Sequence, residues 1–200
     1  MGFARVVCIE GPIAAGKSSL LLELEARGFA VFPEPVEVWE PWLAAFYSRN
    51  TPPEGLVLGL QLRVLMSLHA IHDAIRTRPS FPHGVVFVER SPVACRDVFG
   101  PVTGLLPREA ELFDEVYRAC RWLPTEHVYL RVPWAVCDTR RVARGRGSET
   151  GVGCSLEYMR LVHDAHEARF RGSAMTIDTD GTDSPKELVD RVLASLQITV

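Results

Sequence analysis

Residues 6–29 read VVCIEGPIAAGKSSLLLELEARGF, and this stretch decides the fold. Its centre, Gly11–Ser18, matches the pattern G-x-x-x-x-G-K-S/T. An apolar run typical of a buried strand precedes the match. A segment with leucines at helical spacing follows it and stops at Gly28. The order of strand, glycine-containing loop and helix is the context that a phosphate-binding loop needs.

The loop residues suit the phosphates of a nucleoside triphosphate. Glycines let the backbone N–H groups turn inward around a phosphate, and the helix N-terminus adds its dipole. Lys17 can reach the terminal phosphates, and Ser18 can bind Mg²⁺. We therefore expect ATP to bind at Gly11, Ala14, Ala15, Gly16, Lys17, Ser18 and Ser19.

Five short apolar runs alternate with longer segments of helical period. The runs cover residues 5–10, 29–35, 84–90, 127–132 and 174–179, and the helical segments cover 17–28, 54–78, 107–123, 155–172 and 184–196. Strands that alternate with helices indicate a parallel sheet. The sequence predicts an α/β protein with the P-loop NTPase fold, in which a five-stranded parallel sheet is flanked by helices on both faces. We expect one domain over residues 1–200.

The bulk composition is that of a globular protein. Hydrophobic residues make up 47% of the chain and charged residues 24%, and the net charge is −3. This balance does not match nucleic acid or an anionic membrane, and no apolar run reaches the length of a membrane span. The five cysteines are scattered without a C-x-x-C pair, which indicates reduced thiols. We predict a cytoplasmic protein with small-molecule partners, no nucleic acid and no membrane.

A phosphate-binding loop fits either transfer of a phosphoryl group or a switch that binds GTP and signals. Signalling GTPases read guanine with an N-K-x-D stretch. The chain has a single asparagine, Asn50, and Thr51-Pro52 follows it. The switch function is therefore disfavoured, and we expect a phosphotransferase.

Charged residues follow two of the predicted strands. Glu34 comes after the second strand, and Glu89-Arg90 ends the third. In open parallel sheets, ligands bind in the crevice at the carboxyl ends of the strands. Trp39 offers a flat apolar wall close to Glu34. These residues predict an acceptor site beside the phosphate loop.

The chain resembles the deoxyribonucleoside kinase family nearly from end to end. This family includes the cellular deoxycytidine, deoxyguanosine and mitochondrial thymidine kinases and, more distantly, herpesvirus thymidine kinases. Besides the phosphate loop, the resemblance rests on Gln61 and on EPVEVW (34–39), ERSPVACRDVF (89–99), RVARGRGSE (141–149) and LEYMRLVHDAHE (156–167). It implies transfer of the γ-phosphate of ATP to the 5′-hydroxyl of a deoxyribonucleoside. The compact length and the composition suggest a DNA-virus member, located in the host cytoplasm or nucleus.

The resemblance assigns roles around the transferred phosphate. Glu34 resembles the general base for the 5′-hydroxyl, and Arg90 neighbours the same oxygen. Glu89 would hold Mg²⁺ together with Ser18. The predicted catalytic residues are Lys17, Glu34, Arg90, Arg144 and Arg146.

An arginine-rich segment over about residues 140–153 resembles a lid that closes on ATP. Arginine offers a fixed fork of donors to phosphate oxygens, and we expect Arg144 and Arg146 to make such contacts. Arg140 resembles the residue that stacks on the adenine, and Asp180 lies in the loop 178–184, which we expect beside that ring.

The nucleoside is expected between Gln61 and several aromatic side chains. The amide of Gln61 has a donor and an acceptor, as the edge of a pyrimidine requires. Phe99 resembles the ring that stacks on the base, and Trp39 would close the wall. Tyr47 and Glu149 resemble the pair that binds the 3′-hydroxyl.

Three positions near the base tune substrate choice in the family, and here they are Val64, Leu68 and Cys95. Members that prefer deoxycytidine and purines place an Arg–Asp pair at the last two positions. The uncharged Leu68 and Cys95 leave room for the 5-methyl group of thymine. Thymidine is therefore the predicted main substrate, with deoxycytidine as a second candidate.

The alternatives are a nucleoside monophosphate kinase and a deoxynucleoside kinase that prefers purines. A monophosphate acceptor would need additional basic residues, and Glu34 would repel its phosphate. A non-catalytic ATP-binding module would need neither Glu34 nor the lid arginines. The histidines at 163 and 166 lack the further ligands of a zinc site. Family resemblance implies a homodimer, for which the apolar helix at 54–77 could supply a face.

Overall fold

The computed structural model describes residues 4–199 and contains one parallel sheet. Its strands are β1 (Arg5–Glu10), β2 (Ala30–Phe32), β3 (Val85–Glu89), β4 (Glu126–Arg131) and β5 (Met175–Asp178), in the order β2-β3-β1-β4-β5. The strand β1 lies at the centre, paired with β3 through Ile9 and Glu89 and with β4 through Ile9 and Val128. The predicted five-stranded parallel sheet is confirmed.

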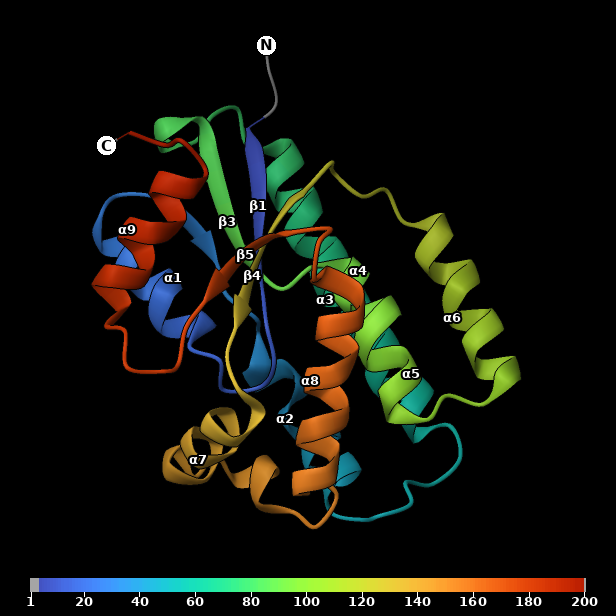
Figure 1. Ribbon diagram of the computed structural model, residues 1–200. Helices are drawn as coiled ribbons and strands as arrows, with labels where there is room; N and C mark the ends of the chain where they lie inside the picture. Colours follow the sequence, from blue (N-terminus) through green and yellow to red (C-terminus); the bar gives the residue numbers. More distant parts are fainter. Residues whose placement is uncertain (1–3, 200) are drawn as a thin grey trace.

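Helices cover both faces of the sheet (Figure 1). The helices α1 and α9 lie together on one face, and α3, α4 and α8 lie on the other. The helices are α1 (Lys17–Ala26), α2 (Val36–Tyr47), α3 (Leu56–Thr77), α4 (Pro92–Ala94), α5 (Gly100–Thr103), α6 (Pro107–Ala119), α7 (Trp134–Arg144), α8 (Leu156–Phe170) and α9 (Pro185–Ser195). Short 3-10 turns occur at Pro82–Gly84 and Gly147–Thr150, and a π-helical turn, Cys95–Phe99, joins α4 to α5.

The side chains of β1 alternate between the two faces of the sheet and pack against the helices on each face. Val7 and Ile9 pack into the cluster that contains Leu20 and Leu24 of α1, whereas Val6 and Cys8 pack with Ile75 of α3. All these side chains are at most 4% exposed. A parallel strand that is covered on both faces needs such a continuous apolar run. Burial of each large aliphatic side chain contributes about 1.5–3 kcal/mol.

Three helical regions are not among the predicted helices: α2, the stretch 92–103, and α7. Pro41 lies inside α2, and Pro92 and Pro101 lie in the stretch 92–103. Proline is typical of turns and loops, so it weakens the sequence signal for a helix in both regions. In α7 only Cys137 is buried, and the rest of the helix carries the arginines that predicted a lid. In proteins most helical stability comes from tertiary packing, which a local sequence pattern does not contain.

Several surface and thiol features complete the fold. All five cysteines are free thiols. No helix within residues 4–199 is both long enough and apolar enough to cross a membrane. The helix α3 buries one face, including Leu60, Leu65 and Leu68, and leaves Met66 48% exposed.

Candidate active site

The phosphate loop, Gly11–Ser18, leaves the carboxyl end of β1 and turns into α1. The backbone has positive φ at Gly11, Ala14 and Gly16, with values of 148°, 61° and 99°. Only glycine fits at position 11, because a Cβ there would lie 2.9 Å from the carbonyl oxygen of Leu130. The loop therefore wraps tightly around the N-terminus of α1, where an anion is bound favourably.

Lys17 is the first residue of α1, and its ammonium group folds back over the loop. Its Nζ donates to the carbonyl oxygens of Pro12, at 3.0 Å, and Gly11, at 3.2 Å. Burial of the side chain, followed by the nearby charge of Arg90, lowers the pKa of Lys17 to about 8. Lys17 Nζ can exchange these two carbonyl oxygens for the oxygens of a phosphate.

Ser18 and Glu89 are in contact where β3 ends. Ser18 Oγ donates to Glu89 Oε1 at 3.0 Å. Burial, and then the charge of Glu34, raises the pKa of Glu89. A hydroxyl and a carboxylate beside a phosphate loop are an oxygen donor set that fits Mg²⁺, and Ser18 and Glu89 would hold this ion.

Glu34, after β2, and Arg90, after β3, form an ion pair next to this loop. Arg90 Nε donates to Glu34 Oε1, and the two side chains are 6% and 12% exposed. Arg90 Nη1 also donates to the carbonyl oxygen of Gly11 at 3.3 Å, so the pair is tied to the phosphate loop. The backbone φ of Arg90 is 69°, a conformation that non-glycine residues rarely adopt. Such strain occurs often at functional sites.

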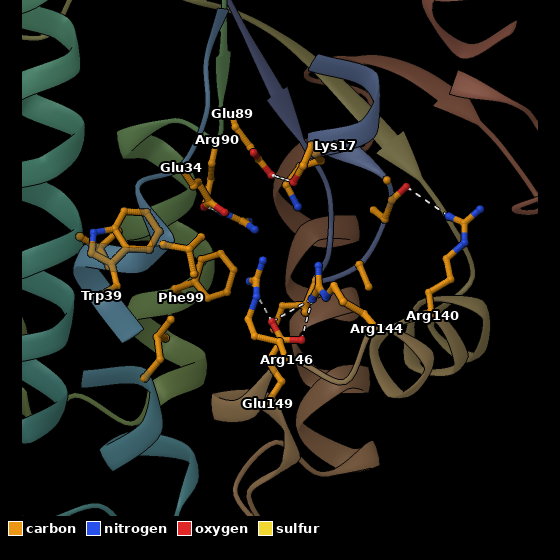
Figure 2. Close-up of a pocket in the computed structure, with 18 of the residues that line it drawn as sticks. Lys17, Glu34, Trp39, Glu89, Arg90, Phe99, Arg140, Arg144, Arg146 and Glu149 are labelled. Atoms are coloured by element: carbon orange, nitrogen blue, oxygen red, sulfur yellow. Dashed lines mark hydrogen bonds and ion pairs between the residues drawn. The ribbon is translucent and has the colours of Figure 1, made fainter. Parts of the chain in front are cut away.

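A single cavity of about 510 Å³ runs past all of these groups (Figure 2). This volume is typical of a site for a small molecule. The predicted residues that line it come from the phosphate loop, the acceptor side and the lid. They are Ala14, Ala15, Gly16, Lys17, Ser18, Ser19, Glu34, Trp39, Tyr47, Gln61, Val64, Glu89, Arg90, Phe99, Arg140, Arg144, Arg146 and Glu149.

The predicted lid spans the end of α7 and the turn that follows. Arg144 and Arg146 both pair with the carboxylate of Glu149, at 2.6 Å and 3.2 Å, inside the cavity (Figure 2). The later part of the segment is fixed against α2. There, Gly153 N donates to the Tyr47 carbonyl oxygen at 2.8 Å, and a Cβ on Gly151 would lie only 2.2 Å from the same oxygen. The arginines therefore project from a segment that is anchored at its far end.

Gln61 marks the uncharged end of the cavity. Its side chain is 3% exposed, and Nε2 donates to Thr103 Oγ1 at 3.3 Å. On the other side, Gln61 Oε1 lies 3.4 Å from Cys95 Sγ. These contacts hold the amide in one orientation at the edge of the cavity. The neighbouring lining residues Leu60, Val64, Trp39, Phe99 and Thr103 carry no charge.

Four predicted site residues are not among those that line the cavity: Gly11, Leu68, Cys95 and Asp180. Leu68 is buried with Cys95 and Phe113 behind Gln61, and neither Leu68 nor Cys95 lines the cavity. Asp180 lies outside on a neighbouring surface, and its carboxylate accepts from Thr182. Gly11 contributes its carbonyl oxygen to Lys17 and Arg90 instead of lining the cavity.

The site also includes residues that were not among the individually predicted site residues. Asp183, three residues after Asp180 in the same predicted loop, lines the cavity, and so does Leu188 of α9. Arg140 Nη2 donates to the carbonyl oxygen of Gly181 at 2.6 Å, which links α7 to this C-terminal loop. Tyr158 of α8 packs edge-on against Tyr47, with ring centroids 5.6 Å apart. Thr103 lies four residues after Phe99, so in a helix the two side chains share one face. The sequence did not reveal this relation, because the helical stretch 92–103 was not predicted.

A parallel sheet with a phosphate loop after its central strand, a carboxylate–arginine pair beside that loop and an amide in an uncharged recess defines a phosphotransferase with a small organic acceptor. The chain belongs to the deoxynucleoside kinase family, because the model of that family matches residues 7–197. It is thus an ATP-dependent kinase that phosphorylates nucleosides.

Individual relatives agree with this family. The chain is 33% identical over 208 residues to a thymidine kinase of Ictalurid herpesvirus 1, covering 96% of this chain and 85% of that protein. It is 30% identical over 177 residues to the human mitochondrial thymidine kinase 2, covering 81% of this chain and 63% of that protein. A solved deoxyadenosine kinase from M. mycoides has the same fold, with a TM-score of 0.79 over 96% of this chain and 99% of that one at 18% identity.

Proposed function

We propose that thymidine is the main acceptor of this kinase and that deoxycytidine is a second substrate. The observation that carries the proposal is the uncharged recess around Gln61, which is continuous with the phosphate loop. Leu68 and Cys95 support it from behind the recess, where an Arg–Asp pair would otherwise place charges. Two relatives that carry the name thymidine kinase point the same way.

The proposed chemistry divides the cavity into an acceptor side and a donor side. Glu34 takes the proton of the 5′-hydroxyl, and Arg90 neutralises charge on the phosphoryl group in transit. Lys17 holds the terminal phosphates of ATP, and Ser18 and Glu89 would hold Mg²⁺, which would neutralise negative charge on these phosphates. Tyr47 and Glu149 bind the 3′-hydroxyl, and Trp39 and Phe99 enclose the base.

The donor side is closed by the lid. We assign Arg144 and Arg146 to the phosphates of ATP and Arg140 to the adenine. We further propose a homodimer that buries the exposed apolar side chains of α3 and its neighbour α6, such as Met66 and Leu112. Size measurement of the purified protein in solution tests the dimer.

The acceptor is tested by steady-state phosphorylation with MgATP of thymidine, deoxycytidine, deoxyadenosine, deoxyguanosine and thymidine monophosphate. We expect the highest kcat/KM with thymidine. Turnover of purine nucleosides alone would overturn the proposed specificity but retain the reaction. Turnover of the monophosphate alone would overturn the assignment of Glu34 to a 5′-hydroxyl.

The lowered pKa of Lys17 predicts that ATP binding weakens at alkaline pH. The protonated amine attracts the phosphates, and in the free protein it loses its proton as the pH rises through about 8. Bound phosphate raises this pKa again, so above pH 8 the dissociation constant for ATP should rise, by up to about tenfold per pH unit. Calorimetry between pH 7 and pH 10 should also show proton uptake on binding. The same pH dependence in Lys17→Met would contradict the assignment.

A further inference from the structure

His166 of α8 is wholly buried directly behind the acceptor site. Its Nδ1 lies 2.7 Å from the carbonyl oxygen of Val162. A carbonyl oxygen can only accept, so Nδ1 carries the proton in this contact. Burial, and then the charge of Arg90, lowers the pKa of His166 well below its usual value, which keeps the ring neutral. The lone pair of a neutral ring with this tautomer is therefore on Nε2.

That lone pair meets the guanidinium group of Arg90. His166 Nε2 lies 3.3 Å from Arg90 Nη1, and the same Nη1 donates to Gly11 O at 3.3 Å. The Phe99 ring covers the group from one side, with Arg90 Cζ 4.4 Å from the ring centroid, and the Phe99 and His166 rings meet edge-on at 5.7 Å. The two N–H groups of Nη1 therefore donate to Gly11 O and His166 Nε2.

These contacts determine how Arg90 meets Glu34. Buried arginine and carboxylate groups frequently form a bidentate pair. Here Nε is the donor to Glu34 Oε1, and within residues 4–199 no hydrogen bond reaches Glu34 Oε2 or leaves Arg90 Nη2. One carboxylate oxygen therefore remains for the 5′-hydroxyl, and two N–H groups remain for a phosphoryl oxygen.

We propose that His166 is a positioning residue for phosphoryl transfer: its Nε2 lone pair fixes the guanidinium group of Arg90 and so prevents a bidentate pair with Glu34. The proposal rests on the proposed functions of Glu34 and Arg90. Loss of the acceptor at Nε2 lets the guanidinium group turn toward Glu34, which occupies the base and withdraws the donor from the phosphoryl group. Binding of either substrate does not require this contact, so kcat is the parameter that changes.

Two substitutions separate the acceptor from the volume of the ring. His166→Asn retains a donor near the place of Nδ1 and has no acceptor near the place of Nε2, whereas His166→Gln can restore an amide oxygen there. We expect His166→Asn to lower kcat by up to about 10²-fold, as small misplacements of reacting groups do, with little change in either KM. His166→Gln should recover most of the loss. His163→Gln, on the same helix, is the matched control and should leave kcat unchanged.

A double-mutant cycle distinguishes positioning from a general structural role. In Arg90→Lys, which lacks Nη1, adding His166→Asn should cause no further loss of kcat. Additive losses, an unchanged kcat in His166→Asn, or an equal loss in a folded His166→Gln would each overturn the proposal. If His166→Asn does not fold, His166→Gln decides alone: its kcat should stay close to that of the unmodified enzyme, and a large loss of kcat in the folded variant would overturn the proposal. An Arg90→Lys enzyme with unchanged kcat would instead contradict the proposed function of Arg90.

Discussion

Replacement of Glu34 by glutamine is expected to lower kcat by about 10²–10⁴-fold, the range for loss of a general base. The amide has nearly the same shape as the carboxylate, and its oxygen can still accept from Arg90 Nε. The fold and the position of both side chains should therefore persist. What the amide cannot do is accept the proton of the 5′-hydroxyl. Because phosphoryl transfer depends mainly on positioning and charge, the loss also includes the poorer orientation of this hydroxyl.

The measurement is kcat with saturating MgATP and thymidine, together with direct titration of ATP. The titration should give an affinity close to that of the unmodified protein, since Glu34 is assigned to the acceptor. Glu37→Gln is the matched control, because Glu37 is an exposed carboxylate in the first turn of α2, three residues after Glu34. A Glu34→Gln enzyme that retains kcat within a few-fold would remove Glu34 from the mechanism.

Removal of both lid arginines is expected to have the second large effect. Arginines that reach the transferred phosphate are typically worth about 10³–10⁵ in kcat, and we expect Arg144→Ala/Arg146→Ala to fall in this range. In the structure both side chains pair with the same carboxylate, Glu149. Either arginine can therefore partly replace the other, and each single substitution should cost less than its share of the double loss.

The rate constant of phosphoryl transfer is measured in single-turnover experiments, because lid opening can limit the steady-state kcat. Arg160→Ala is a suitable control, since Arg160 lies on the exposed side of α8 with 69% of its side chain accessible. Thermal unfolding of each variant checks that loss of the Glu149 partners has not unfolded the lid. Single-turnover rates within about tenfold of the unmodified enzyme in the double variant would assign the arginines to binding or to structure alone.

Much of the site could be predicted because it is built from local sequence signals on a regular fold. The loop Gly11–Ser18 and the charges after β2 and β3 are each read from a few adjacent residues. Parallel strands bring their carboxyl ends to one edge, so Glu34, Glu89 and Arg90 had to meet the phosphate loop once the sheet was predicted. The structure places all four features on one cavity.

Other positions depend on packing between elements that are far apart in the chain. Leu68 and Cys95 lie behind Gln61 because α3 meets the π-helical turn Cys95–Phe99, and the rotation of that turn is not encoded in a short pattern. The loop after β5 lines the cavity with Asp183, and not with Asp180, because Asp180 turns back to bind Thr182. A shift of a few residues along a loop is enough to change which side chain lines the cavity.

The sequence by itself determined the parallel α/β sheet, the phosphate loop and the acid–base pair at its edge, because apolar period, glycine placement and strand ends are local properties of the chain. Only the tertiary structure decided the surroundings of Arg90. His166 is 76 residues away in sequence, and Phe99 and Gly11 come from two further elements. Their convergence depends on how α8 packs across the sheet, since buried polar groups must find partners wherever the fold brings them together.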